Sequence, residues 1–190
     1  MIQNCGFEAD NASVPYPSDW TTDAGYALNA GGFNQVVPTP NSGDFALQFG
    51  NYDYQGPAGI YQTFSDNSGD TYQVTFYTYD GGAGGDDNAF LAASIDGTQG
   101  LELTGCDGCS TAGPSQYTAY QFDFTGTGSD TLYFQAQTNP SEWFLDDVSV
   151  VDTTSVDAGA SATPEPASML LLGSGLLAFG LRTRARLRRR

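Results

Sequence analysis

Residues 120–137, YQFDFTGTGSDTLYFQAQ, contain two runs in which apolar and polar side chains alternate, separated by a glycine-rich segment. The apolar positions of the two runs are Tyr120, Phe122, Phe124, Leu132, Phe134 and Ala136. A period of two residues is typical of strands that bury one face, and glycine-rich segments favour turns. The stretch therefore predicts two β-strands separated by a turn.

The same pattern recurs throughout residues 1–152, which contain no convincing helical period. Further strands are expected near residues 45–49, 58–64, 72–77, 89–96, 99–104 and 144–150, with pairing partners near 5–9 and 19–28. The chain has 24 Gly, 12 Phe and 11 Tyr, a composition that favours strands and turns. About nine short strands in a domain of this size predict an all-β fold, a jelly-roll β-sandwich.

The charge distribution excludes several functions. All six basic residues are arginines within residues 182–190, so residues 1–181 carry 22 carboxylates and no basic side chain, and the chain has no His. Without Lys or Arg the folded part cannot neutralise phosphates, which excludes nucleic-acid binding. Without an imidazole, Ser-His and Cys-His catalysis and His-ligated zinc are excluded as well.

The cysteines give no firm assignment. Their number is odd (Cys5, Cys106 and Cys109), so they cannot all pair within the chain. Cys106-Asp-Gly-Cys109 is compatible with a redox motif, half a zinc site, or a local disulfide or free thiols in a loop. The redox motif needs a βαβ context and a zinc site needs more soft ligands, and the sequence shows neither. A local disulfide or free thiols in a loop are therefore favoured.

The composition changes after residue 152. Residues 153–163 are small and polar and are expected to form a linker. Pro164-Glu165-Pro166 follows, then an apolar run over residues 167–181 and the arginine cluster. As a helix, this run would span roughly 22 Å at ~1.5 Å per residue, less than the ~30 Å hydrocarbon core. A short C-terminal anchor with its basic end in the cytoplasm is one interpretation.

The order of these three parts resembles the PEP-CTERM sorting signal of exopolysaccharide-producing Gram-negative bacteria. The resemblance covers residues 164–190 and implies export, transient anchoring in the inner membrane, and processing by an exosortase near Pro164, Glu165 and Pro166. The mature protein would then lie at the cell surface or outside the cell. Such proteins normally begin with a secretory signal peptide, which residues 1–4 do not resemble. We therefore expect either that the start codon is placed too far downstream or that an upstream part is left out.

Residues 4–151 resemble the jelly rolls of carbohydrate-binding modules in four places. These are Asn4-Cys5-Gly6-Phe7-Glu8 with Trp20, Ser42-Gly43-Asp44-Phe45-Ala46 with Gln62-Thr63-Phe64, Gly69 through Phe76, and Trp143 through Val150. The resemblance implies a non-catalytic module that binds polysaccharide. A purely structural or adhesive matrix protein without a defined sugar site is the alternative.

Asp146 is expected to share the buried face of the last strand with Phe144, Val148 and Val150. A lone buried carboxylate must be paired, protonated or bound to metal, and the domain has no basic side chain. Ca²⁺ satisfies this requirement with oxygen ligands. The resemblance implies a structural Ca²⁺ held by Glu8 and Asp146, with the turn at Asp44 supplying a carbonyl. Hydrogen bonds from backbone amides to Asp146, or an exposed Asp146, are the alternatives.

Two other groups of acidic residues could form sites. Residues 80–87, DGGAGGDD, match one copy of a glycine-aspartate calcium repeat, but a strand-joining loop is favoured because such repeats act in series. Adjacent carboxylates such as Asp146 and Asp147 point to opposite faces of a strand, so they cannot form the facing pair of a glycosidase. No nucleophile and base can be assembled, and we expect no enzyme.

A sugar site needs exposed aromatic rings. Tyr77 and Tyr79 occupy the polar face of their predicted strand, and Trp143 is predicted to point outward, so these three are the candidate ligand contacts. Chance exposure of a few aromatic side chains is the alternative, because the chain is rich in them. The expected partner is a polysaccharide or another component of the extracellular matrix.

Overall fold

The computed structural model describes residues 2–51, 55–81, 89–104, 117–138 and 142–154. These residues form ten strands and one short helix: β1 (Thr21–Thr22), α1 (Ala24–Ala27), β2 (Gln35–Val37), β3 (Ala46–Phe49), β4 (Ala58–Ser65), β5 (Thr71–Asp80), β6 (Phe90–Ile95), β7 (Thr98–Thr104), β8 (Thr118–Thr125), β9 (Ser129–Gln137) and β10 (Trp143–Asp152). Met1–Thr154 make one compact unit and Ser155–Arg190 a second, which lies outside the described residues.

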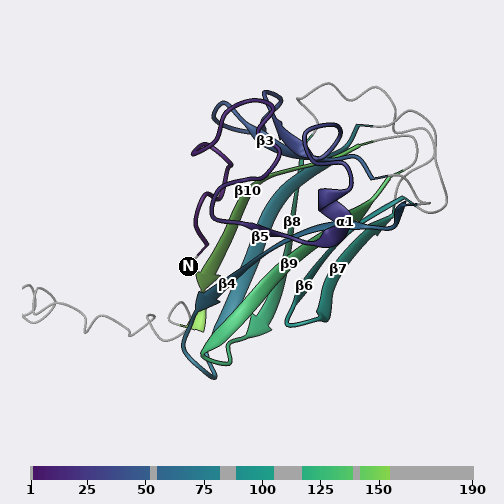
Figure 1. The fold of residues 1–190 in the computed structure, drawn as a ribbon. Coiled ribbons are helices and arrows are strands. Elements are labelled where there is room, and N and C mark those ends of the chain that lie inside the picture. The colour runs from purple at the N-terminus through teal and green to yellow at the C-terminus, as the bar shows by residue number, and fades with distance from the viewer. Residues whose placement is uncertain (1, 52–54, 82–88, 105–116, 139–141, 155–190) are drawn as a thin grey trace, which may run out of the picture. The chain divides into compact units, whose positions relative to one another are not determined.

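The strands form two five-stranded sheets, each entirely antiparallel (Figure 1). One has the order β1-β4-β9-β6-β7 and is called here the β9 sheet. The other has the order β2-β3-β10-β5-β8 and is called the β10 sheet. The predicted all-β sandwich is thus confirmed. The two runs of residues 120–137 are β8 and β9, and they lie in different sheets, so the turn between them connects the two layers.

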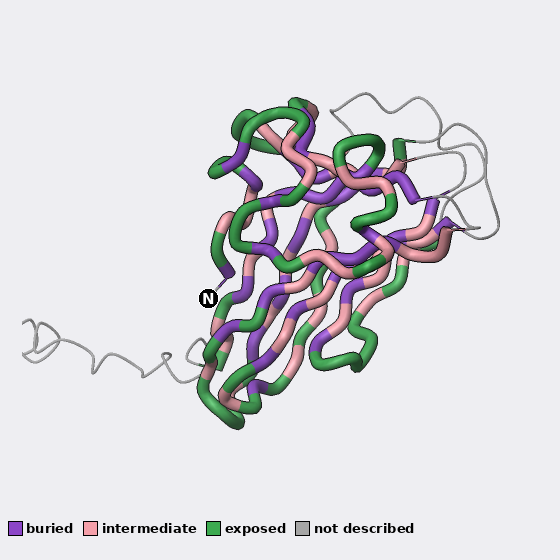
Figure 2. The backbone as a smooth tube through the Cα atoms, in the orientation of Figure 1, coloured by how far each residue is buried: buried purple, intermediate pink, exposed green. Residues whose placement is uncertain are grey.

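Burial alternates along most strands, as Figure 2 shows, and exposed residues gather at the turns. The inward side chains form one core between the sheets. Its aromatic centre is Phe134 of β9, whose ring centroid lies 5.1 Å from that of Phe76 and 6.1 Å from that of Trp20. Burial of such rings contributes most of the favourable free energy of a sandwich core.

The expectation of a strand near residues 5–9 is wrong, because these residues form turns. A pairing partner within residues 19–28 is present as the short strand β1, which pairs with β4 and is followed by α1. The N-terminal segment nevertheless lies beside the last strand, because the Val148 N–H donates to the Cys5 carbonyl at 2.9 Å. β2 was not predicted, since its three residues are too few to show a period.

Candidate functional site

The last strand contains a bulge that changes which side chains face the core. The register of β10 against β5 shifts between Asp146 and Ser149, and Asp147 has a positive φ of 49°. One extra residue reverses the alternation on one side of a bulge. As a result Trp143 and Leu145, not Phe144 and Asp146, share the core face with Val148 and Val150. The prediction that Phe144 and Asp146 point into the core is wrong.

Asp146 is nevertheless fully buried, because the loop before β3 covers it. Its Oδ2 accepts hydrogen bonds from the backbone N–H groups of Asn41 at 2.7 Å and Ser42 at 3.2 Å, and its Oδ1 accepts from the N–H of Asp147 at 2.7 Å. Burial raises the pKa of Asp146 to about 6, and the nearby Asp147 carboxylate adds to the rise against these hydrogen bonds. Backbone amides thus satisfy the hydrogen-bonding needs of this carboxylate. This was one of the two alternatives to a bound Ca²⁺.

Glu8 holds the next residues of the same loop. Its Oε1 accepts from the backbone N–H groups of Asp44 at 2.9 Å and Phe45 at 3.0 Å. Asp44 therefore meets Glu8 through its N–H. Glu8 and Asp146 both lie near Gly6, since a Cβ on Gly6 would be 3.4 Å from Asp146 Oδ1 and 3.7 Å from Glu8 Cγ. Their role as joint metal ligands stays a prediction.

Asp147 belongs to the same cluster, contrary to the expectation that it faces the opposite side. Its carboxylate accepts from Asn41 Nδ2 at 2.8 Å and Ser42 Oγ at 2.7 Å. The oxygen ligands are of the type that Ca²⁺ prefers. Among the described residues, however, no three acidic, His or Cys side chains are arranged to hold a metal ion. The calcium site therefore stays a prediction.

The three aromatic residues predicted as sugar contacts have different environments. The prediction that Trp143 points outward as a sugar contact is wrong, because the bulge turns its side chain into the core, where it is 4% exposed. Tyr79 is buried on the outer side of the β10 sheet, stacked on Phe144 with ring centroids 4.5 Å apart and planes 6° apart. Its ring face is thus already covered. Tyr77 is partly exposed and sits opposite Asp146 on the outer face of the same sheet.

The outer face of the β9 sheet carries a different aromatic pair. Tyr61 of β4 and Tyr133 of β9 lie directly opposite each other, both partly exposed, with ring centroids 6.0 Å apart and planes at 64°. They line an open hollow of about 490 Å³, here called the tyrosine hollow, formed by Asp23, Tyr61, Asp96, Gly97, Thr131 and Tyr133. Its volume falls in the range of ligand sites in proteins.

A fixed hydrogen-bond chain positions Tyr133. Its hydroxyl donates to Asp23 Oδ2 and accepts from Gln135 Nε2 at 3.2 Å. A Cβ on Gly59 would collide with the Tyr133 phenol and with Asp23, so only glycine lets the ring lie there. Burial raises the pKa of Tyr133, and the hydrogen bond to Asp23 raises it further, which keeps the hydroxyl protonated as a donor.

Asp23 in turn connects the tyrosine hollow to α1. As the N-cap of this helix, it accepts the Tyr26 N–H through Oδ1 at 2.7 Å. At the other end of the hollow, Asp96 and Gly97 form the tight turn between β6 and β7, both with positive φ (48° and 76°). Asp96 accepts the Thr131 N–H through Oδ1 at 2.9 Å. Two carboxylates therefore border the aromatic pair.

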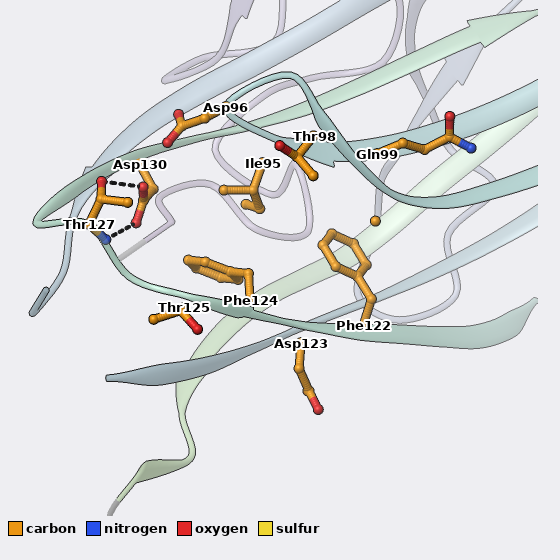
Figure 3. Close-up of a pocket in the computed structure, with 11 residues that line it drawn as sticks. Ile95, Asp96, Thr98, Gln99, Phe122, Asp123, Phe124, Thr125, Thr127 and Asp130 are labelled. Atoms are coloured by element: carbon orange, nitrogen blue, oxygen red, sulfur yellow. Dashed lines mark hydrogen bonds between the residues drawn. The ribbon is translucent and has the colours of Figure 1, made fainter. Parts of the chain in front are cut away.

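A second hollow, of about 350 Å³, lies between β7 and β8 at the edges of the two sheets (Figure 3). Phe122 and Phe124 extend into it, whereas Asp123 points away from them. Both phenyl rings are partly buried and pack against the core. This hollow is thus a gap at the open edge of the sandwich.

Beside this gap, the carboxyl groups of three turn residues contact one another: those of Asp66 and Asp96 both form hydrogen bonds with that of Asp130. Burial, followed by contact with Asp130, raises the pKa values of Asp66 and Asp96. Burial opposes ionisation of Asp130 too, but hydrogen bonds from Asp66 and from Thr127 outweigh it and lower its pKa to about 2. Thr127 donates to Asp130 through its Oγ1 at 2.6 Å and its N–H at 2.9 Å, as Figure 3 shows.

Sequence reasoning missed Tyr61 and the role of Tyr133. The available signal was that each tyrosine occupies a polar-face position of an alternating strand. The sequence did not show that the two tyrosines lie opposite each other, because β4 and β9 are far apart in the chain. The predictions for Cys106, Cys109, residues 82–87, the linker beyond residue 154, the helix over 167–181 and the sorting motif at 164–166 lie outside the described residues. Of the described residues, none form a helix that is long and apolar enough to cross a membrane.

Comparison with solved structures shows what this sandwich is similar to. TmCBM61, solved in complex with β-1,4-galactotriose, is 16% identical with a TM-score of 0.56, and the match covers 80% of this chain and 97% of that one. The K2 cleaved adhesin domain of Lys-gingipain is 18% identical with a TM-score of 0.50, over 77% and 95%. A CBM4 structure is 16% identical with a TM-score of 0.47, over 80% and 99%.

Sequence comparison identifies a motif in the C-terminal part of the chain. Residues 162–186 match the family described as the PEP-CTERM protein-sorting motif, which confirms the resemblance seen in the sequence. No curated protein matches the chain. The chain thus combines a β-sandwich of the kind found in carbohydrate-binding modules with a PEP-CTERM sorting motif, which indicates an exported protein.

Proposed function

We propose that this chain is a non-catalytic cell-surface protein that binds polysaccharide through the tyrosine hollow. The observation that carries the proposal is the pair Tyr61 and Tyr133, placed opposite each other on an open sheet face beside fixed polar groups. The fold shared with TmCBM61, which was solved with a galactotriose, supports the same class of ligand.

The geometry suits a sugar ring for two reasons. Pyranose rings present apolar C–H faces that pack on aromatic rings, and the two tyrosines offer such surfaces at an angle to each other. Sugar hydroxyls also need hydrogen-bond partners, which fix orientation in ligand sites. Asp23, Asp96 and the tyrosine hydroxyls supply them within the same hollow. The hollow is open, which allows a polymer chain to continue beyond the bound residues.

Replacing Tyr61 by Ala should weaken binding of a neutral trisaccharide such as β-1,4-galactotriose, or of the best binder in a glycan array, by at least roughly tenfold, because one stacking surface is lost. Isothermal titration calorimetry on residues 1–154 measures this, with the melting temperature as the check on folding. The change truncates a partly exposed side chain, so folding should be retained.

Tyr77→Ala is the matched control, since Tyr77 is a partly exposed tyrosine on the other sheet. If Tyr77→Ala removes binding and Tyr61→Ala does not, the site lies on the β10 sheet. If no glycan or exopolysaccharide binds the unmodified protein, the structural or adhesive matrix protein becomes the better interpretation.

For the sorting motif, we propose inner-membrane anchoring followed by processing near Pro164-Glu165-Pro166 by an exosortase in a Gram-negative host. The motif match supports this route. Mass spectrometry of protein from the cell surface or medium should find no peptide from the arginine cluster at 182–190. Recovery of surface protein that still ends in Arg190 would contradict the proposal.

We also propose a structural Ca²⁺ near Glu8 and Asp146. The Asp146 and Asp147 carboxylates beside Gly6, with the Glu8 side chain next to them and no basic side chain in residues 1–181, support it. The role of the ion would be to neutralise these carboxylates and fix the loop before β3 against β10.

A further inference from the structure

The charges around the tyrosine hollow restrict the class of sugar that it accepts. Asp23 and Asp96 border the aromatic pair, and no Lys, Arg or His occurs among residues 1–181. A uronic acid or sulfated sugar would place an anion beside two carboxylates with no cation to offset the repulsion. Such sugars are therefore poor ligands for this hollow.

The Asp23 carboxylate has neutral partners, whereas Asp96 also forms a hydrogen bond with the carboxyl group of Asp130. Asp23 accepts from the Tyr26 N–H and the Tyr133 hydroxyl, and Asp96 accepts from the Thr131 N–H. A carboxylate can accept about four hydrogen bonds, so each retains lone pairs for a ligand. The charge of Asp23, and the negative charge shared by the hydrogen-bonded Asp96 and Asp130, can thus attract a cation that enters the open side of the hollow.

The aromatic pair favours a cation as well. The face of a phenol ring carries negative potential, which attracts an ammonium group placed over it. Tyr61 and Tyr133 line the same hollow as the two carboxylates, and the Tyr133 hydroxyl contacts Asp23 directly. A sugar that carries an ammonium group would gain from stacking, from the ring faces and from the carboxylates in one bound position.

We propose that the tyrosine hollow selects amino sugars, that is, a glycan whose units carry protonated amino groups. This inference rests on the proposed function, because it assigns the ligand class to the same site. The combination of two ring faces and two carboxylates without a local basic residue carries it. At exposed sites each of these interactions is modest, and together they predict a preference of roughly tenfold.

The experiment compares two trisaccharides that differ only in the group at one position of each ring. The β-1,4-linked glucosamine trimer carries ammonium groups where the β-1,4-linked glucose trimer carries hydroxyls. Calorimetric titration of residues 1–154 at pH 6 and physiological salt should show roughly tenfold tighter binding of the glucosamine trimer. Trigalacturonic acid should bind least.

Two isosteric variants separate the local carboxylate from the net charge. Asp96→Asn should remove most of the preference, while Asp123→Asn, which loses the same charge on the outer face of the other sheet, should keep it. Asp96→Asn retains an oxygen that can accept the Thr131 N–H, so the turn should stay folded, and melting temperatures check this.

Equal or tighter binding of the glucose trimer overturns the amino-sugar assignment. If Tyr61→Ala still weakens that binding, the proposed function stands. An equal loss of preference in both Asn variants also overturns the assignment, because it shows that net charge alone attracts the amine. Failure of the glucosamine trimer to bind overturns it too, and the neutral glycans then decide the proposed function separately.

Discussion

Excess Ca²⁺ should raise the free energy of unfolding of the chelator-treated domain by about 2.7 kcal/mol at a hundredfold excess over Kd, if the ion binds the native state alone. The physical reason is that the carboxylates of Asp146 and Asp147 lie together beside Gly6, next to the Glu8 side chain. These carboxylates repel one another, and burial raises the pKa of Asp146 to about 6. Bound Ca²⁺ would offset both costs. Urea denaturation in EDTA and in millimolar Ca²⁺ measures the difference.

Asp146→Asn is the informative variant, because it removes the buried charge and keeps the shape of the side chain. The gain from Ca²⁺ should disappear in this variant and persist in Asp123→Asn, whose carboxylate lies on an exposed outer face. Asp147 cannot serve as the control, since its carboxylate binds the same loop. Identical unfolding curves in EDTA and Ca²⁺ would show that backbone amides alone stabilise Asp146.

The sandwich was predictable because it follows from local alternation. Phe122 and Phe124 of β8, like Leu132 and Phe134 of β9, share the face that their spacing assigns to them. Such spacing says which side chains share a face, but it does not say which strands pair. The alternation of residues 131–137 thus assigns Tyr133 to the polar face of its strand, but it does not show that Tyr61, 72 residues earlier in the chain, lies opposite it.

The error at the last strand has one physical cause. Asp147 adopts a left-handed backbone conformation in a bulge, and a bulge of one residue exchanges the two faces of the strand before it. Trp143 therefore enters the core, and Asp146 meets the loop before β3. Aspartate tolerates positive φ better than most residues, yet the sequence Asp146-Asp147 is equally compatible with a regular strand. Only the tertiary pairing decides between them.

The tyrosine hollow depends on a buried polar network behind α1. Asn34 is fully buried, and its Nδ2 donates to the Tyr26 carbonyl at 2.9 Å and to Asn51 Oδ1 at 2.5 Å. Its Oδ1 accepts the Gly50 N–H at 2.8 Å. Asn34 thus ties the helix that Asp23 caps to the end of β3. An apolar side chain in place of Asn34 would leave the Tyr26 carbonyl and the Gly50 N–H without these hydrogen bonds.

Asn34→Ala should lower the free energy of unfolding by at least about 3 kcal/mol, since each buried polar group left without a partner costs about 1–3 kcal/mol. Urea denaturation measures the loss, and Asn67→Ala, a change at an exposed asparagine, should alter stability by less than about 0.5 kcal/mol. In molecules that remain folded, α1 loses its anchor, so Asp23 should hold Tyr133 less firmly and glycan affinity should fall. Full stability of Asn34→Ala would contradict the network, whereas lost stability with unchanged affinity would show that Asp23 is positioned without it.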